Sequence, residues 1–157
     1  MRRTDEELMR LVLDAARRAD AVGDVPVGAV VVDGSGAVIG TGHNERESTH
    51  DPTAHAEVLA IRQAARARDS WRLEDCTLVV TLEPCTMCAG ATVLARLNRV
   101  VYGATDPKAG AVGSLWDVVR DRRLNHRPEV VAGVLAEECE ELLRGWFESK
   151  RGSTTLR

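Results

Sequence analysis

Residues 77–97 read TLVVTLEPCTMCAGATVLARL, and this stretch decides the fold. Residues 77–82 are rich in β-branched side chains and predict a buried strand. Glu83 and Pro84 end that strand, and residues 85–97 predict a helix that begins at a cysteine. A strand that leads directly into a helix is typical of an α/β domain.

The same alternation of strands and helices extends over most of the chain. Helical spacing of apolar residues and capping signals predict further helices at 5–19, 53–68, around 115–120 and 136–150. Short apolar runs predict further strands at 27–32, 37–41, 99–104 and 130–134, the first two forming a hairpin around a Gly-rich turn. We expect one three-layer α/β/α domain over residues 1–150, with about five strands in a mixed sheet and helices on both faces, then a flexible tail at 151–157.

Composition narrows the class of protein. A chain of 157 residues that is 44% hydrophobic has enough apolar material for one core. No apolar run approaches the roughly 20 residues of a membrane span, and the start, MRRTDEE, lacks a secretory core. Four cysteines are poor grounds for a disulfide framework, and we expect Cys76 and Cys139 to be small buried residues. We therefore expect a cytoplasmic protein without a membrane partner.

The net charge of −3 argues against generic binding to a nucleic acid backbone. Arginines nevertheless cluster at 120–127, and basic residues return at 150–157, beyond an acidic block at 137–141. A solvated face is the first explanation of any single one of these charges. A nucleic acid ligand stays open if binding is local and specific.

Two short motifs carry metal-ligand chemistry. His55 and Glu57 belong to one, and Cys85 and Cys88 to the other, thirty residues later. One imidazole and two thiolates give zinc three protein ligands, and a catalytic site leaves the fourth position to water. Zinc lowers the pKa of that water from about 16 toward about 7. His-x-Glu followed by Pro-Cys-x-x-Cys is typical of zinc-dependent nucleobase deaminases, in which the glutamate carries protons.

Both motifs fall at predicted helix starts, which favours this interpretation. Unpaired N–H groups at a helix start lower thiol pKa values, so we expect Cys85 and Cys88 to be deprotonated. Residues two apart on a helix point about 200° from one another, so Glu57 is not expected to join His55 as a ligand.

Alone, a Cys-x-x-Cys pair is equally typical of a structural zinc site or a redox pair. A structural zinc ion usually has four Cys or His ligands, and the further candidates in this chain are His43, His50, Cys76 and His126. Cys76 is separated from Cys85 by a whole predicted strand, which makes it a poor candidate. The order and spacing of the motifs, with Pro84, favour a catalytic zinc site.

Beyond the ligands, the chain resembles the bacterial tRNA adenosine deaminase family, within the cytidine deaminase-like superfamily. The resemblance covers roughly residues 5–150 and rests on VPVGAV at 25–30, HDPTAHAE at 50–57, TLEPCTMCAGA at 81–91, the segment 103–115 and NHR at 125–127. Free-cytidine deaminases usually carry Cys in place of His55, so the chain departs from them.

The resemblance implies a cytidine deaminase-like fold, one zinc ion per subunit and hydrolysis of the wobble adenosine in a tRNA anticodon stem-loop to inosine, by a homodimer. It implies that His55, Cys85 and Cys88 bind zinc and that Glu57 carries protons. The implied substrate contacts are Asn44, the backbone N–H of Ala56, and the apolar walls Val27 and Leu82. Val27 and Leu82 are equally explained as plain core residues.

Two further regions have predicted contacts. Asp106 follows a strand, and its carboxylate is expected either to accept a hydrogen bond from a ribose 2′-hydroxyl or to cap the turn at Pro107. The resemblance also implies RNA contacts by the terminal helix, at Phe147, Lys150 and Arg151. Trp146 and Phe147 are adjacent, so they face different directions and one of them belongs to the core.

Two alternative functions stay open. One is deamination of free guanine or another nucleobase, and the segments 106–115 and 125–127 favour the RNA enzyme over it. The other is an RNA-binding module with structural zinc and no catalysis. Glu57 argues against that module, because a binding module gains nothing from a carboxylate beside the metal.

Overall fold

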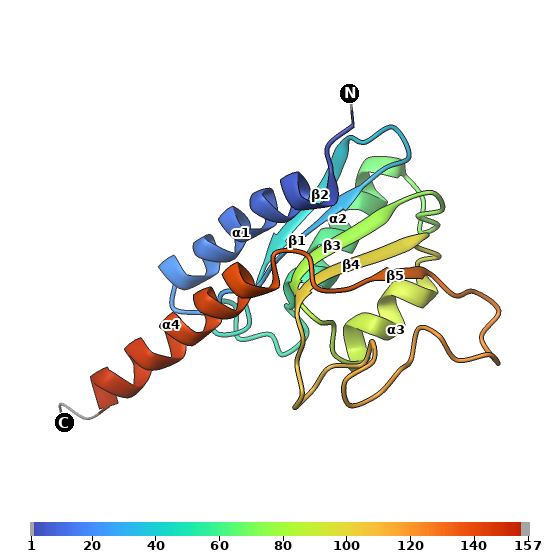
Figure 1. Ribbon diagram of the computed structural model, residues 1–157. Coiled ribbons are helices and arrows are strands. Elements are labelled where there is room, and N and C mark those ends of the chain that lie inside the picture. The colour runs from blue at the N-terminus through green and yellow to red at the C-terminus, as the bar shows by residue number, and fades with distance from the viewer. Residues whose placement is uncertain (1, 155–157) are drawn as a thin grey trace.

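The computed structural model describes residues 2–154, and for residues 152–154 only the backbone. Its centre is a five-stranded sheet in the order β2-β1-β3-β4-β5 (Figure 1). β1 is antiparallel to both its neighbours, whereas β3, β4 and β5 are parallel to one another. The strands are β1 Gly28–Val32, β2 Val38–His43, β3 Thr77–Leu82, β4 Arg99–Ala104 and β5 Glu129–Val131. The prediction of a mixed sheet with about five strands is confirmed.

Helices cover both faces of this sheet. α1 (Asp5–Ala21) and α4 (Ala136–Thr154) lie on one face, and α2 (Ala56–Arg68) and α3 (Thr86–Leu94) on the other (Figure 1). Side chains of successive strand residues point to opposite faces, so each strand serves two cores. In β3, Val79 packs with the α1 core, whereas Leu78 and Val80 pack with the α2 and α3 core. The three-layer α/β/α architecture is therefore confirmed.

Glycines in β2 allow α2 to lie close against the sheet. A Cβ atom at Gly40 would overlap the carbonyl oxygen of Ala60, and one at Gly42 would overlap that of Ala56. The facing side of α2 is correspondingly small, with Ala56, Ala60 and Ala64 buried. This contact fixes the start of α2, and with it the position of His55.

Two helices begin later than the sequence predicts. α2 starts at Ala56 rather than residue 53, because Asp51 accepts hydrogen bonds from both the N–H and the hydroxyl of Thr53 and so caps a separate turn. α3 starts at Thr86 rather than at Cys85. It ends at Leu94 rather than residue 97, since the backbone at Arg96 turns left-handed.

The prediction of a short helix around 115–120 is wrong. Gly113 has a φ of +127°, its N–H donates to the carbonyl of Trp116, and Val112 pairs with Asp117 across a tight turn. The last strand is β5, which covers 129–131 rather than 130–134. α4 continues to Thr154, so the first four residues of the expected tail are helical, while residues 155–157 lie outside the described part.

The cysteines follow the expectation from composition. Cys76 and Cys139 are buried, and all four cysteines are free thiols.

Within residues 2–154, no helix is both long and apolar enough to cross a membrane.

Candidate active site

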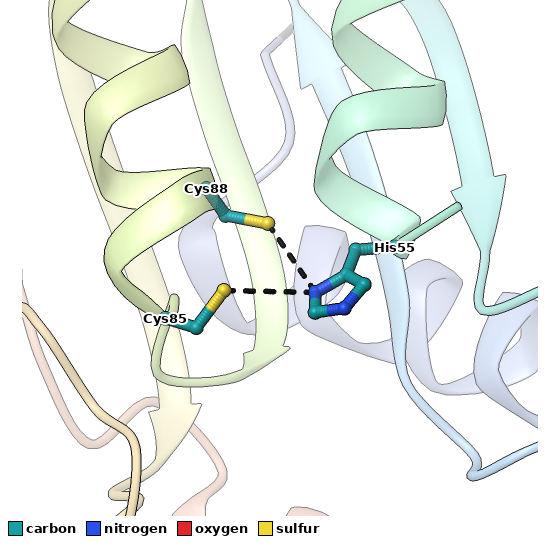
Figure 2. Close-up of side chains that lie close together, drawn as sticks. All are labelled: His55, Cys85 and Cys88. Atoms are coloured by element: carbon teal, nitrogen blue, oxygen red, sulfur yellow. Dashed lines mark hydrogen bonds between the residues drawn. The ribbon is translucent and has the colours of Figure 1, made fainter. Parts of the chain in front are cut away.

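Three predicted ligands meet at the starts of α2 and α3. The Nδ1 atom of His55 lies 3.6 Å from the Sγ atom of Cys85 and 3.6 Å from that of Cys88. Figure 2 shows the three side chains pointing toward one another from the two helices. His55 and Cys85 precede their helices in extended conformation, and Cys88 lies in the first turn of α3.

These separations fit a zinc ion. Zinc–sulfur bonds of about 2.3 Å and a zinc–nitrogen bond of about 2.0–2.1 Å at the tetrahedral angle hold nitrogen and sulfur about 3.6 Å apart. The three ligand atoms also all lie within 4.8 Å of one another. No side chain has to move far for the group to hold the ion.

The pKa values of the two thiols are shifted in opposite directions by their contact with one another. A hydrogen bond from the Cys88 thiol lowers the pKa of Cys85 to about 3. The same bond, together with burial, raises the pKa of Cys88, so the pair shares one proton. The hydrogen bond with Cys85 raises the pKa of His55. The lowered pKa of Cys85 agrees with the expectation of a thiolate, whereas the raised pKa of Cys88 differs from it, because Cys88 holds the proton that the two sulfurs share. A bound cation would displace that proton.

A fourth protein ligand is missing from this group within residues 2–154, where His55, Cys85 and Cys88 form the one cluster of three or more potential ligands. The other candidates have different surroundings: Arg68 donates to Cys76, and a ring nitrogen of His126 lies 2.6 Å from the carbonyl oxygen of Leu97. Three protein ligands match a catalytic zinc site rather than a structural one.

Glu57 lies beside the cluster and outside it. Its side chain is 4% exposed, and burial raises the pKa of its carboxyl group. A buried carboxylate with a raised pKa holds a proton more readily than an exposed one, which suits a group that takes up and releases protons.

A cavity of about 170 Å³ opens next to His55, Glu57 and Cys85. All five residues predicted to contact substrate line it, namely Val27, Asn44, Ala56, Leu82 and Asp106. Val27 also belongs to the core beneath α2 and α3, so it is both a wall of the cavity and a core residue. The structure therefore brings the predicted substrate residues and the ligand cluster to one cavity.

Two of the lining side chains are held by hydrogen bonds. The amide of Asn44 donates to the carbonyl of Val25 and accepts from the N–H of Arg46. The Oδ1 atom of Asp106 accepts from the N–H groups of Lys108 and Ala109. Asp106 therefore caps its turn, and a ribose contact by the same carboxylate is a separate proposal.

The predicted RNA contacts on α4 lie apart from the residues that line the cavity. Phe147 is 47% exposed, and Trp146 meets it edge-on with ring centres 5.0 Å apart. The Nζ atom of Lys150 lies 5.4 Å from the centre of the Trp146 ring. Of the two aromatic residues, Phe147 is the more exposed.

Four lining residues were missed from the sequence: Val25, Arg46, Glu83 and Ala109. Val25 and Glu83 lie inside the quoted motifs, and Glu83 stands directly at a strand end, which was the available signal. Arg46 lies in a polar loop, where nothing distinguishes it from a solvated charge.

The comparisons with known proteins agree with this geometry. Residues 2–104 match the family model described as the cytidine and deoxycytidylate deaminase zinc-binding region. The tRNA-specific adenosine deaminase of Haemophilus influenzae is 49% identical over 147 residues, which are 94% of this chain and 85% of that protein. That of Bacillus subtilis is 48% identical, over 94% of this chain and 91% of that protein.

The chain belongs to the tRNA-specific adenosine deaminase family.

Solved structures place this deaminase among the same relatives. A structure from a study of A-to-I editing by tRNA:A34 deaminases is 44% identical, with a TM-score of 0.83, covering 87% of this chain and 99% of that one. Guanine deaminase from Nitrosomonas europaea is 29% identical, with a TM-score of 0.77, covering 91% of this chain and 84% of that one. The deaminase fold and the use of zinc inferred from the sequence are confirmed, and the editing family is favoured over free guanine deaminases.

Proposed function

We propose that this zinc-dependent deaminase converts the wobble adenosine of a tRNA anticodon loop to inosine, consuming water and releasing ammonia. The observation that carries the proposal is the position of Glu57, buried beside a three-ligand metal cluster at a cavity. The relatives named for activity on tRNA match along almost the whole chain, which supports RNA as the substrate.

Each residue has a defined task in this reaction. His55, Cys85 and Cys88 would hold a zinc ion, which would make hydroxide available at neutral pH. Glu57 would take one proton from the attacking water and deliver it to the purine ring nitrogen. It would then pass the remaining proton, from the hydroxyl group added at carbon 6, to the departing amine. The oxygen of the water would end on carbon 6 and the carbon–nitrogen bond would break, giving inosine and ammonia.

The cavity walls orient the nucleoside. Ala56 opens α2, where backbone N–H groups have no partner within the helix, so its N–H is suited to the base edge. Val27 and Leu82 enclose the base, Asn44 contacts the nucleoside, and Asp106 accepts from the ribose 2′-hydroxyl through the oxygen not used in its turn. A base in an anticodon loop is already unpaired, so turning it into this cavity costs only a few kcal/mol.

The anticodon stem-loop binds across the cavity mouth and α4. The exposed cation Arg46 at the cavity is suited to the RNA backbone. Phe147, Lys150 and Arg151 offer an aromatic face and positive charge on α4, the combination that single-stranded loops bind.

The proposal includes assembly and location. We propose a homodimer, because large apolar side chains are exposed, including Leu94 at 70%, Leu115 at 50% and Trp116 at 58%. We propose that it works in the cytoplasm, since four free thiols suit a reducing compartment.

One experiment tests the reaction. Zinc-loaded protein is incubated with an anticodon stem-loop, and separately with free adenosine and free guanine. Inosine in the stem-loop, lost in Glu57→Ala, is the expected result. Ammonia release from guanine alone would favour the nucleobase enzyme, and stem-loop binding without inosine would favour the binding module.

A further inference from the structure

The loop between Asp106 and Ser114 forms part of the cavity wall, through Asp106 and Ala109. It lies just beyond the zinc-binding region matched by the family model, which ends at residue 104. The segment forms turns rather than a helix or strand, so regular secondary structure does not hold it in place. Its position depends on what ties it to the sheet.

Several hydrogen bonds hold the loop, among them one from the N–H of Ala111 to the carbonyl of Pro84, and Glu83 accepts four of them. Its side chain is 2% exposed and follows the end of β3. The Oε1 atom accepts from the N–H of Asp106 at 3.1 Å and from the hydroxyl of Ser114. The Oε2 atom accepts from the N–H groups of Val112 and Ser114, both at 3.0 Å. One buried carboxylate thus gathers four donors from both ends of the loop.

We propose that Glu83 is a positioning residue that sets the place of Asp106 in the substrate cavity. Four donors occupy its two oxygens, so Glu83 serves as a fixed acceptor and not as a second proton carrier beside Glu57. Through the N–H of Asp106 it fixes the backbone of the residue that meets the ribose, an inference that rests on the proposed function.

The conservative variant Glu83→Gln separates the two oxygens. Neither backbone N–H group on the Oε2 side can become an acceptor, so the amide oxygen stays there. The amide nitrogen takes the Oε1 position, where the Ser114 hydroxyl can turn round and accept from it. The N–H of Asp106 then faces another N–H group and loses its partner. The variant therefore releases the Asp106 end of the loop and keeps the Val112 end.

A second variant perturbs the contact between Glu83 and the loop and leaves the charge of Glu83 unchanged. A Cβ atom at Gly110 would overlap the carboxyl carbon of Glu83 and come within 2.6 Å of the carbonyl oxygen of Asp106. Gly110→Ala therefore pushes the loop away from Glu83. Ser114→Ala is the matched control, because it removes one donor to Glu83 but leaves the bond from the N–H of Asp106.

The first test is amide hydrogen exchange in the zinc-loaded protein, measured residue by residue by NMR. We expect exchange at Asp106 to rise about tenfold or more in Glu83→Gln, the effect of losing one hydrogen bond to a charged group. Exchange at Val112 should stay near that of the wild type in Glu83→Gln, as should exchange at Asp106 in Ser114→Ala. Unchanged exchange at Asp106 in both Glu83→Gln and Gly110→Ala would overturn the proposal.

The second test is kinetic, on the anticodon stem-loop. We expect Glu83→Gln and Gly110→Ala to raise KM about tenfold and to keep kcat within about threefold, with one zinc per chain. A large fall in kcat at unchanged KM, or loss of zinc, would show that Glu83 acts on the metal centre instead. If the wild-type protein forms no inosine, the proposed function fails, and the exchange test still decides whether Glu83 holds Asp106.

Discussion

His55 and Cys85 hold the same position in two different helices: each is the extended residue immediately before the first helical turn, and their ligand atoms lie 3.6 Å apart. Parallel placement of the two helix starts at one end of the sheet brings together residues thirty positions apart in the chain. The metal centre is therefore a direct product of the way the strands lead into α2 and α3.

Removal of one thiol ligand should abolish zinc binding. Cys88→Ala leaves two protein ligands, and we expect less than a tenth of a zinc ion per chain, with loss of activity. The measurement is metal content by mass spectrometry after dialysis. Cys76→Ala is the matched control, because Cys76 is buried outside the ligand cluster, and it should retain one zinc ion. Equal zinc in both variants would contradict the assignment.

Loss of the proton carrier should stop the chemistry and leave the metal. Glu57→Gln keeps the shape of a buried side chain that lies outside the ligand cluster. We expect kcat on the stem-loop to fall by about 10²–10⁴-fold, the usual contribution of a general acid–base group. Zinc content should stay at one per chain. Loss of zinc in this variant would mean that Glu57 is a ligand.

Asp106 should set the preference for RNA. Asp106→Asn keeps an oxygen for the turn but removes the charge offered to the ribose 2′-hydroxyl. We expect the ratio of kcat/KM on an RNA stem-loop to that on the matching DNA stem-loop to fall about tenfold. An unchanged ratio would mean that Asp106 only caps its turn and does not contact the ribose 2′-hydroxyl.

The basic end of α4 should affect binding of RNA and not chemistry. In Lys150→Ala we expect weaker stem-loop binding, with the slope of log K against log salt reduced by about 0.7–0.9, the value for one phosphate contact. Phe147→Ala should weaken binding at all salt concentrations by loss of one stacking face, about 1–3 kcal/mol. Binding isotherms at several salt concentrations measure both effects. If both variants bind the stem-loop as tightly as the wild type does, the RNA does not contact this end of α4.

Close packing of α2 on β2 should show in stability. We expect Gly42→Ala to lower the free energy of unfolding by about 1–3 kcal/mol, because the added methyl group overlaps the backbone of α2. Gly145→Ala is the contrasting variant, since nothing lies within 4 Å of its added Cβ, and it should stabilise α4 by up to about 1 kcal/mol. Urea denaturation distinguishes the two, and equal effects would contradict the packing account.

Much of this molecule is predictable from its sequence because its signals are local. β3 and β4 match their predicted bounds, since both contain β-branched residues and Glu83 and Pro84 directly follow β3. The zinc ligands are predictable because their order and spacing match the pattern His-x-Glu followed by Pro-Cys-x-x-Cys. The later start of α2 was missed because Asp51 caps a turn with the same hydrogen bonds that it would use to cap a helix.

The missed features depend on contacts between distant segments. The position at a strand end makes Glu83 a candidate, but its role is not visible locally, because its donors come from residues 106–114. The sequence predicts a short helix around 115–120, whereas the left-handed backbone at Gly113 and the pairing of Val112 with Asp117 hold a turn there. Such choices are made by tertiary contacts and not by propensity.

X-ray absorption at the zinc edge tests the central claim most directly. The account predicts one zinc ion per chain, with two sulfur ligands at about 2.3 Å, one imidazole nitrogen at about 2.0–2.1 Å and one light ligand from solvent that an added inhibitor can displace. A shell of four protein ligands, or zinc-free protein with Cys85 bonded to Cys88, would contradict it.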